Sequence, residues 1–204
     1  MSHDDDLIAY YGAEAAGGHR KRHDDHRIGL RQNFAALLVG EGRRSLVDVG
    51  AGPGLDTTEW RAAGFDVVGV DLTHANVVIM GQRDLTCVTG SLYNLPFRTG
   101  AFDALWSMST FVHVPHERFD EAMIELLRVV CPGAPLGIGT WGGLDFEGVT
   151  EFGDLRPYRF FSLATHDRWR KMLACHGNIE SFETHRPDAD HGWEYQFAVL
   201  RAPS

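Results

Sequence analysis

An acidic residue followed by three closely spaced glycines is the feature of this chain best suited to ligand binding. Asp48 lies in an apolar run and is followed by Gly50, Gly52 and Gly54 in the pattern GxGxG. The loop that holds a nucleoside triphosphate needs a lysine, and none follows these glycines nearby. The turn that holds a dinucleotide needs a third glycine where Leu55 stands. The pattern therefore favours a cationic ligand without phosphate, because the Asp48 carboxylate would attract an ammonium group and repel a pyrophosphate.

A second acidic residue ends the next apolar run of the chain. Asp71 closes the run VVGVD and lies 17 residues after Gly54. A carboxylate at the end of such a strand can accept hydrogen bonds from both hydroxyl groups of a ribose. Because dinucleotide sites share this feature, Asp71 predicts a ribose without identifying the cofactor.

Alternating strands and helices are expected to position these residues. Apolar runs predict strands over 45–50, 66–72, 85–90, 102–108 and 134–141. Apolar residues at helical spacing predict helices over 24–38, 57–63, 75–82, 117–130 and 165–176. A glycine- and acid-rich loop is expected after residue 141. Only a polar loop separates the last two predicted strands, so we expect them to pair antiparallel over 179–184 and 193–200.

This alternation predicts an α/β fold. We expect a Rossmann-like, seven-stranded, mostly parallel sheet with one antiparallel strand and with helices on both faces. A chain of 204 residues is long enough for one domain with a sizeable core. Within it, residues 1–42 are expected to form an N-terminal helical cap or lid, and residues 43–204 the ligand-binding domain.

Composition and charge indicate where the protein is located in the cell and which partners it disfavours. Hydrophobic residues make up 44% of the chain and charged residues 23%, as in ordinary soluble proteins. No apolar run is long enough to span a membrane and no secretory signal is visible, so a cytoplasmic location is expected. The three cysteines are widely spaced and are expected to be reduced. The formal net charge of −9 disfavours nucleic acid as a partner, although residues 19–23 form a short basic cluster.

Histidines invite a metal interpretation, because the chain contains 11 of them. His23 and His26 are spaced so that they could share one face of a helix. However, their segment is strongly charged and no HExxH motif occurs, so we interpret it as a solvated face and predict no metal site.

Three segments together resemble a known family. VDVGAGPG at 47–54, VVGVDL at 67–72 and TGSLYNLPFRTGAFDALWSMSTFVHV at 89–114 occur in this order. They resemble the class I methyltransferases that use S-adenosylmethionine, and most closely their small-molecule branch. The resemblance covers roughly residues 46–141.

The resemblance implies S-adenosyl-L-methionine as the cofactor and a role for several residues. It places the glycine turn under the methionine part, the acid before that turn near the amino-acid end, and Asp71 at the ribose. Ser91 and Leu92 stand where the family often carries an acid for the adenine amino group, so this chain departs from the pattern there. The cofactor-binding residues implied are Asp48, Gly50, Ala51, Gly52, Gly54, Asp71, Leu72, Ser91, Leu92 and Ser107. Taken singly, Asp48 could instead cap the next helix and Asp71 could be a surface strand end.

His113 is the candidate general base. It follows the predicted strand over 102–108, on the side of the sheet where cofactor and acceptor would meet. The ordinary pKa of histidine, near 6.5, suits proton removal at neutral pH. The alternative is that His113 packs, or bonds to a backbone carbonyl.

Candidate acceptor-binding residues are Tyr11, His116, Trp141 and Arg159. Tyr11 could close over the cofactor or anchor the core, and His116 could simply open the next helix. Arg159 could bind a carboxylate of the substrate or pair with Glu151 or Asp154.

Together these features predict a methyltransferase that acts on a small molecule, a metabolite or natural product, by in-line displacement. Two alternatives remain open. One is a non-catalytic protein that binds S-adenosylmethionine as a partner or regulator, and the other is a tRNA-modifying methyltransferase.

Overall fold

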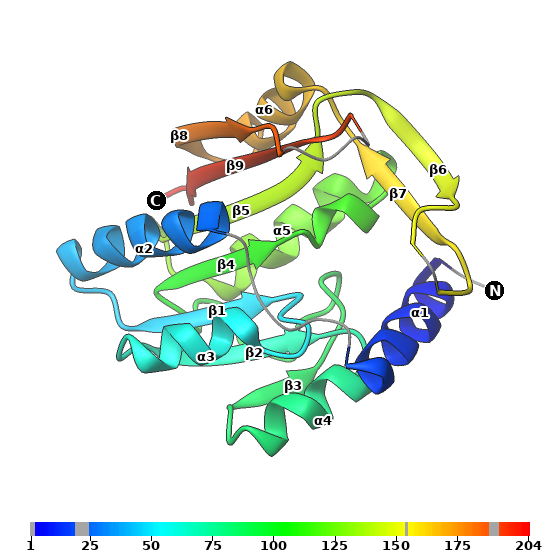
Figure 1. Cartoon of the computed structure of the whole chain (residues 1–204). Helices are drawn as coiled ribbons and strands as arrows, with labels where there is room; N and C mark the ends of the chain where they lie inside the picture. The colour runs from blue at the N-terminus through cyan, green and yellow to red at the C-terminus, as the bar shows by residue number, and fades with distance from the viewer. Residues whose placement is uncertain (1–2, 19–24, 154, 188–191) are drawn as a thin grey trace.

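The computed structural model describes residues 3–18, 25–153, 155–187 and 192–204. Within them, seven strands form one sheet in the order β3-β2-β1-β4-β5-β9-β8 (Figure 1). Strand β9 runs antiparallel to both of its neighbours, and the other pairs are parallel. The strands are β1 (Ser45–Val49), β2 (Asp66–Asp71), β3 (Cys87–Thr89), β4 (Ala104–Met108), β5 (Pro135–Gly142), β8 (Asn178–His185) and β9 (Glu194–Arg201). The predicted seven-stranded sheet with one reversed strand is confirmed.

Helices cover both faces of this sheet, as predicted (Figure 1). On one face, α2 (Asp25–Gly40) and α3 (Leu55–Ala62) pack their apolar residues against the aromatic ring of Trp106. On the other face lie α5 (Phe119–Val129) and α6 (His166–Ala174). Because both faces are covered, β1 and β4 are buried along almost their whole length and are mostly apolar rather than alternating.

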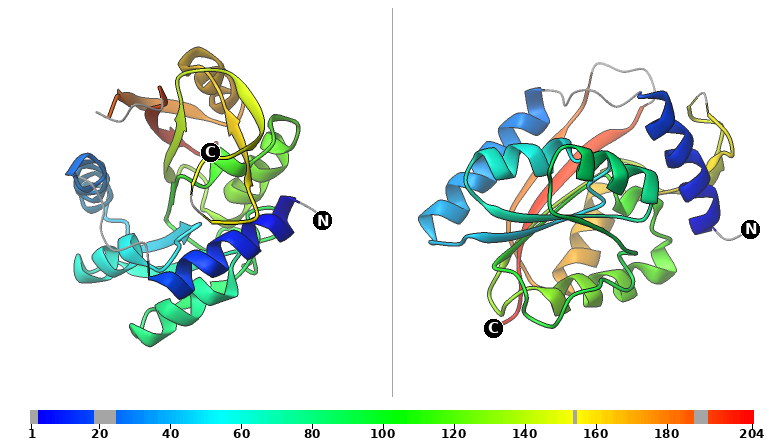
Figure 2. Two further views of the ribbon diagram at one scale, coloured as in Figure 1. Left: turned by 45° about the vertical axis from the view of Figure 1, so that its right-hand side comes forward. Right: turned by 90° about the horizontal axis from the view of Figure 1, so that it is seen from below.

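The bounds of the first helix were not predicted from the sequence, which indicated only a helical N-terminal region over 1–42. Helix α1 (His3–Gly17) lies beside α4 (His74–Gln82) and reaches the strand β7 (Figure 2). Its apolar residues are few, so its periodicity is weak. Three aspartates in its first turn, Asp4 to Asp6, interact favourably with the helix dipole and support the helix without an apolar stripe.

The expected loop after residue 141 contains a hairpin, so that part of the prediction was wrong. Strands β6 (Phe146–Thr150) and β7 (Arg159–Leu163) pair antiparallel and form a separate two-stranded sheet. Glycines and acids in this region hide the strand signal, and only the aromatic run of β7 has strand character. The hairpin lies next to α1 and the short 3-10 helix Phe111–His113.

The order of the strands reverses between β1 and β4. β1 is paired with β2 on one side and with β4 on the other, so the chain moves outward in opposite directions from this point. Loops from the two halves diverge there and leave a crevice at the carboxyl ends of the strands, where α/β sheets bind ligands. The described helices include none with the length and apolarity needed to cross a lipid bilayer.

Candidate active site

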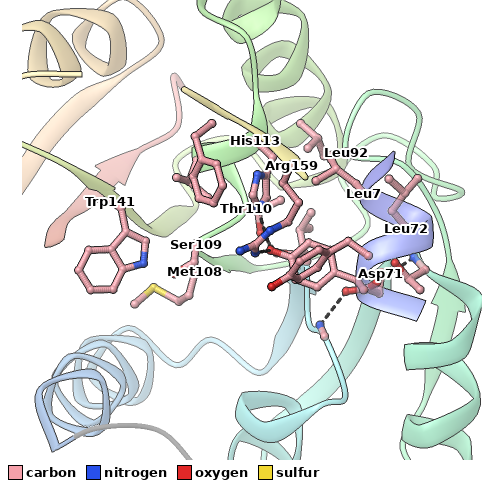
Figure 3. A pocket seen from close by; sticks show the side chains of 18 of the residues that line it. Leu7, Asp71, Leu72, Leu92, Met108, Ser109, Thr110, His113, Trp141 and Arg159 are labelled. Atoms are coloured by element: carbon pink, nitrogen blue, oxygen red, sulfur yellow. Dashed lines mark hydrogen bonds between the residues drawn. The ribbon is translucent and has the colours of Figure 1, made fainter. Parts of the chain in front are cut away.

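A cavity of about 500 Å³ opens at the carboxyl ends of β1, β2 and β4. This volume is typical of a site for a small molecule. Figure 3 shows Trp141 and Met108 at one end of the cavity, Leu7, Leu72 and Leu92 at the other, and Arg159 and His113 between them. Ten of the residues singled out in the sequence line it: Tyr11, Gly50, Gly52, Asp71, Leu72, Ser91, Leu92, His113, Trp141 and Arg159.

The glycine turn forms the floor of the cavity. Gly50 has φ +75° and Gly52 has φ +56°, a left-handed backbone that favours glycine. A Cβ atom on Gly50 would lie 1.9 Å from Oγ1 of Thr110, so the turn and the segment after β4 are in close contact. Gly54 and Ala51 do not line the cavity. A Cβ on Gly54 would instead meet the Met80 side chain at 2.6 Å, so this glycine lets the turn approach α4.

Asp71 is held at the cavity by three hydrogen bonds. Its Oδ2 accepts from the backbone N–H of Gly52 at 2.7 Å. Its Oδ1 accepts from the backbone N–H of Thr73 at 2.8 Å and from the Asn76 side chain at 3.1 Å. A carboxylate has about four acceptor positions. One position on Oδ2 therefore remains available for a ribose hydroxyl, whereas the resemblance implied that both hydroxyls would bind.

Asp48 lies beneath the turn rather than in the cavity. Its side chain is buried, and its Oδ2 accepts a hydrogen bond of 2.6 Å from the hydroxyl of Thr57. Burial, together with repulsion from the Asp56 carboxylate, raises the pKa of Asp48 to about 7. Thr57 belongs to α3, so Asp48 ties the strand to the helix that follows the turn.

Ser107 and His116 also lie outside the cavity lining. Ser107 is fully buried, and the next two residues of the chain, Met108 and Ser109, line the cavity in its place. His116 pairs with Glu147 of the hairpin, with 3.1 Å between its Nδ1 and the carboxylate Oε2. His116 therefore binds the hairpin and lies outside the set of residues that line the cavity.

His113, Tyr11 and Arg159 form one chain of hydrogen bonds from three distant segments. Nδ1 of His113 lies 2.8 Å from the carbonyl oxygen of Phe160, which can only accept, so Nδ1 carries the proton. In the neutral ring Nε2 then accepts from the Tyr11 hydroxyl at 2.7 Å. Nη1 of Arg159 donates to the same hydroxyl at 2.9 Å. The carbonyl contact considered from the sequence is thus present, and it leaves Nε2 as the basic atom of His113.

Several lining residues gave no signal in the sequence. Ser109 has φ +61°, which is unusual for a residue other than glycine and is typical of strained functional positions. Its hydroxyl lies 3.2 Å from that of Tyr195 on β9. Arg27 of α2 lines the cavity while bonded to the buried Asp56 at 2.8 Å. These residues come together only through the fold, so no local motif could have marked them.

Known proteins that are similar in sequence support a ligand-binding role for this cavity. Residues 47–138 match a family model described as a methyltransferase domain. The chain is 29% identical over 135 residues to malonyl-[acyl-carrier protein] O-methyltransferase of Erwinia billingiae, covering 63% of this chain and 52% of that protein. It is 33% identical over 105 residues to demethylmenaquinone methyltransferase of Paenarthrobacter aurescens, covering 50% and 40%. The chain thus spans about half or less of the length of these curated relatives.

Residues 47–138 of this chain are therefore a methyltransferase domain, of the class I S-adenosylmethionine-dependent type. The fold agrees with solved members. The structure of 1,6-didemethyltoxoflavin-N1-methyltransferase of Burkholderia thailandensis, with bound S-adenosylhomocysteine, superposes with a TM-score of 0.69 at 16% identity. That alignment covers 94% of this chain and 85% of the other.

The cofactor of this methyltransferase family is S-adenosylmethionine, and the residues present here fit it. Gly50 and Gly52 leave the floor of the cavity without side chains, and Asp71 has an acceptor position for a ribose hydroxyl. Leu72 and Leu92 supply apolar surface at the end where an adenine ring would lie. Positions 91 and 92, where the family often carries an acid, hold Ser91 and Leu92 in this chain.

Two interpretations from the sequence fall on residues outside the described part. His23 and the basic cluster over 19–23 lie in the gap between residues 18 and 25. Within the described part, no group of three histidine, cysteine or acidic side chains is arranged to hold a metal ion.

Proposed function

We propose that this chain transfers a methyl group from S-adenosylmethionine to a small-molecule acceptor by in-line displacement. One observation carries the proposal. A single cavity joins the glycine turn and Asp71 to the hydrogen-bonded pair of His113 and Tyr11. Groups that suit the cofactor and a group that can take a proton therefore border one shared space.

When bound, S-adenosylmethionine supplies a methyl group that its sulfonium charge already activates. The protein has to align the acceptor with that methyl group and to remove the acceptor's proton. His113 is oriented for this task, because the Phe160 carbonyl fixes its tautomer. For a hydroxyl acceptor, Tyr11 receives the acceptor's proton and passes its own to Nε2 of His113, so the proton that the methyl group replaces ends on His113.

Aromatic side chains in the cavity wall support a small acceptor with an apolar body. Five aromatic lining residues pack against one another: Trp141, Phe152, Phe161, Trp193 and Tyr195. The printed names of the two curated relatives describe different acceptors, malonyl-[acyl-carrier protein] and demethylmenaquinone. The acceptor of this chain is therefore inferred from its own residues.

The N-terminal region 1–42 is proposed to act as a lid in this reaction. Leu7, Tyr10 and Tyr11 of α1 line the cavity, and α1 packs against α4 and β7. A cytoplasmic location is part of the same proposal, since the three cysteines are free, as in a reducing compartment.

Transfer of a labelled methyl group tests the proposal. The protein is incubated with S-[methyl-³H]-adenosylmethionine and a cell extract divided into small-molecule and RNA fractions. We expect label in the small-molecule fraction, and much less with Tyr11→Phe. Binding of the cofactor without transfer to either fraction would support the non-catalytic alternative, and label only in RNA would support a tRNA-modifying enzyme.

A further inference from the structure

Arg159 brings a positive charge into the wall of the cavity, and the described residues do not neutralise it. Its side chain is only 7% exposed and lines the cavity. None of the carboxylates described forms an ion pair with it, including the nearby Glu151. Asp154, the other partner considered from the sequence, lies outside the described residues. A buried guanidinium without a carboxylate is costly unless an anion joins it when the site is filled.

The hydrogen bonds of Arg159 leave several of its donors unused. A guanidinium has five N–H donors. One is given to the Tyr11 hydroxyl at 2.9 Å and one to the carbonyl oxygen of Phe152 at 3.3 Å. The Nε atom is fully buried and has no hydrogen-bond partner among the described residues. Three donors, one of them the buried Nε, therefore have no partner within the described part of the chain.

Aromatic rings fix the plane of this guanidinium. Its central carbon lies 3.8 Å from the ring centre of Tyr10 and 4.9 Å from that of Phe161. Such stacking restricts rotation and keeps the donors aimed in one direction. The arrangement presents a rigid fork next to the Tyr11 hydroxyl.

Two other arginines differ from Arg159 in their position or in their hydrogen-bond partners. Arg156 is exposed, stacks on Tyr158 and donates to the Leu155 carbonyl at 3.0 Å, so it does not enter the cavity. Arg27 lines the cavity but donates two hydrogen bonds to Asp56, at 2.8 and 3.0 Å. Arg27 thus has a carboxylate partner, and Arg159 has none within the described part of the chain.

We propose that the acceptor substrate carries a carboxylate that binds to Arg159. This inference rests on the proposed methyl transfer. A carboxylate is planar, carries one charge and matches a single guanidinium fork with two parallel hydrogen bonds. A phosphate ester fits less well, because it would bring two charges to one unpaired cation. The aromatic walls then accommodate the apolar body of the acid, next to His113.

The position of Arg159 distinguishes the acceptor from the cofactor as the source of this carboxylate. The methionine part of the cofactor also ends in a carboxylate, and it belongs over the glycine turn. Arg159 instead comes from the hairpin and contacts Tyr11, which is bonded to the candidate base His113 (Figure 3). The acceptor's carboxylate is therefore the one that Arg159 binds.

Calorimetric and ligand-observed NMR titrations test this inference in protein saturated with S-adenosylhomocysteine. The probes are benzoate, phenylacetate and hexanoate, each compared with its neutral amide, and phenyl phosphate. We expect at least one acid to bind at least tenfold more tightly than its amide and than phenyl phosphate. Arg159→Gln should abolish this preference, Arg159→Lys should retain part of it, and the exposed Arg156→Gln should leave it unchanged.

The outcomes separate this inference from the proposed function. If S-adenosylhomocysteine binds but no acid binds better than its amide, the carboxylate assignment is wrong and the methyl transfer is untouched. If Arg159→Gln weakens S-adenosylhomocysteine binding by the same factor as acid binding, Arg159 holds the cofactor instead. Failure of the wild type to bind S-adenosylhomocysteine would contradict the proposed function itself. Thermal unfolding of each variant, expected to match the wild type within a few degrees, checks that the site is folded.

Discussion

At the scale of single residues, hydrogen bonds of 2.7 and 2.9 Å join His113, Tyr11 and Arg159 in the wall of the cavity. The sequence identified each of these three residues separately, but not the contacts between them. It also identified Asp48 and Ser107, which are buried and do not line the cavity. A spacing in the sequence marks the end of a strand but does not say whether a side chain there faces the ligand or the core, because side chains alternate between the two faces of a strand.

Removal of the Tyr11 hydroxyl tests the proton path. Tyr11→Phe keeps the ring and breaks the hydrogen bonds to His113 and Arg159. Proton transfer by a positioned group contributes roughly 10²- to 10⁴-fold to a rate, so we expect kcat to fall by about 10²-fold with little change in the KM for S-adenosylmethionine. Steady-state kinetics measures both constants. Tyr158→Phe, which removes a hydroxyl outside the cavity lining, is the matched control, and an equal loss in both variants would argue against the relay.

At the scale of elements, strands and helices with a strong apolar pattern were predicted well. β1, β2 and α5 appear within a few residues of their predicted positions. The sequence did not give the bounds of α1 and missed the β6–β7 hairpin, and these elements bring Tyr11 and Arg159 to the cavity. Both elements are only weakly amphipathic, and α1 is stabilised by packing against β7 of the hairpin and against α4. Such tertiary contacts leave no periodic signal in the sequence. The sequence therefore could not predict that Tyr11 and Arg159 lie together at the candidate acceptor site.

The turn between β1 and α3 gives a prediction at this scale. Gly50→Ala would place a methyl group 1.9 Å from Oγ1 of Thr110, in addition to the cost of a left-handed backbone at φ +75°. Gly64→Ala has a similar backbone at φ +88° but meets nothing within 4 Å, so it isolates the backbone cost, which is about 1–2 kcal/mol.

We expect Gly50→Ala to lower the free energy of unfolding by more than Gly64→Ala and to weaken S-adenosylmethionine binding. Gly64→Ala should bind the cofactor as the wild type does. Urea denaturation and calorimetry measure the two quantities. Identical losses of stability, together with normal cofactor binding by Gly50→Ala, would show that the close contact with Thr110 is unimportant.

At the scale of the whole molecule, buried charges lie under the site. Asp56 is buried and accepts hydrogen bonds from Arg27, Arg31 and Trp106. Asp48 lies near this network, and the Asp56 carboxylate helps to raise its pKa to about 7. The whole chain is also acidic, with a formal net charge of −9. Folding therefore changes the protonation of a group that holds the cofactor turn in place.

This pKa shift predicts how stability depends on pH. The unfolded aspartate titrates near 3.9 and folded Asp48 near 7, so between these values the folded protein binds a proton that the unfolded chain releases. The contribution of Asp48 to the free energy of unfolding consequently falls as pH rises through this window, by at most about 1.4 kcal/mol per pH unit.

Asp48→Asn is the variant that isolates this effect, because its amide oxygen can still accept the hydrogen bond from Thr57. Urea denaturation at pH 5 and pH 8 gives the free energy of unfolding of both proteins. The wild type should lose more stability than Asp48→Asn over this interval. Parallel pH dependence in the two proteins would mean that Asp48 is ionised in the fold at both pH values.

Calorimetric titration with S-adenosylmethionine tests the central claim most directly. Asp71 offers its remaining acceptor position to the ribose, whereas Asp66, at the exposed start of the same strand, lies outside the cavity lining. We predict one bound cofactor per wild-type chain, unchanged affinity for Asp66→Ala and at least tenfold weaker binding by Asp71→Ala, a difference of about 1.4 kcal/mol. Absence of binding by the wild type, or equal binding by Asp71→Ala, would contradict the account.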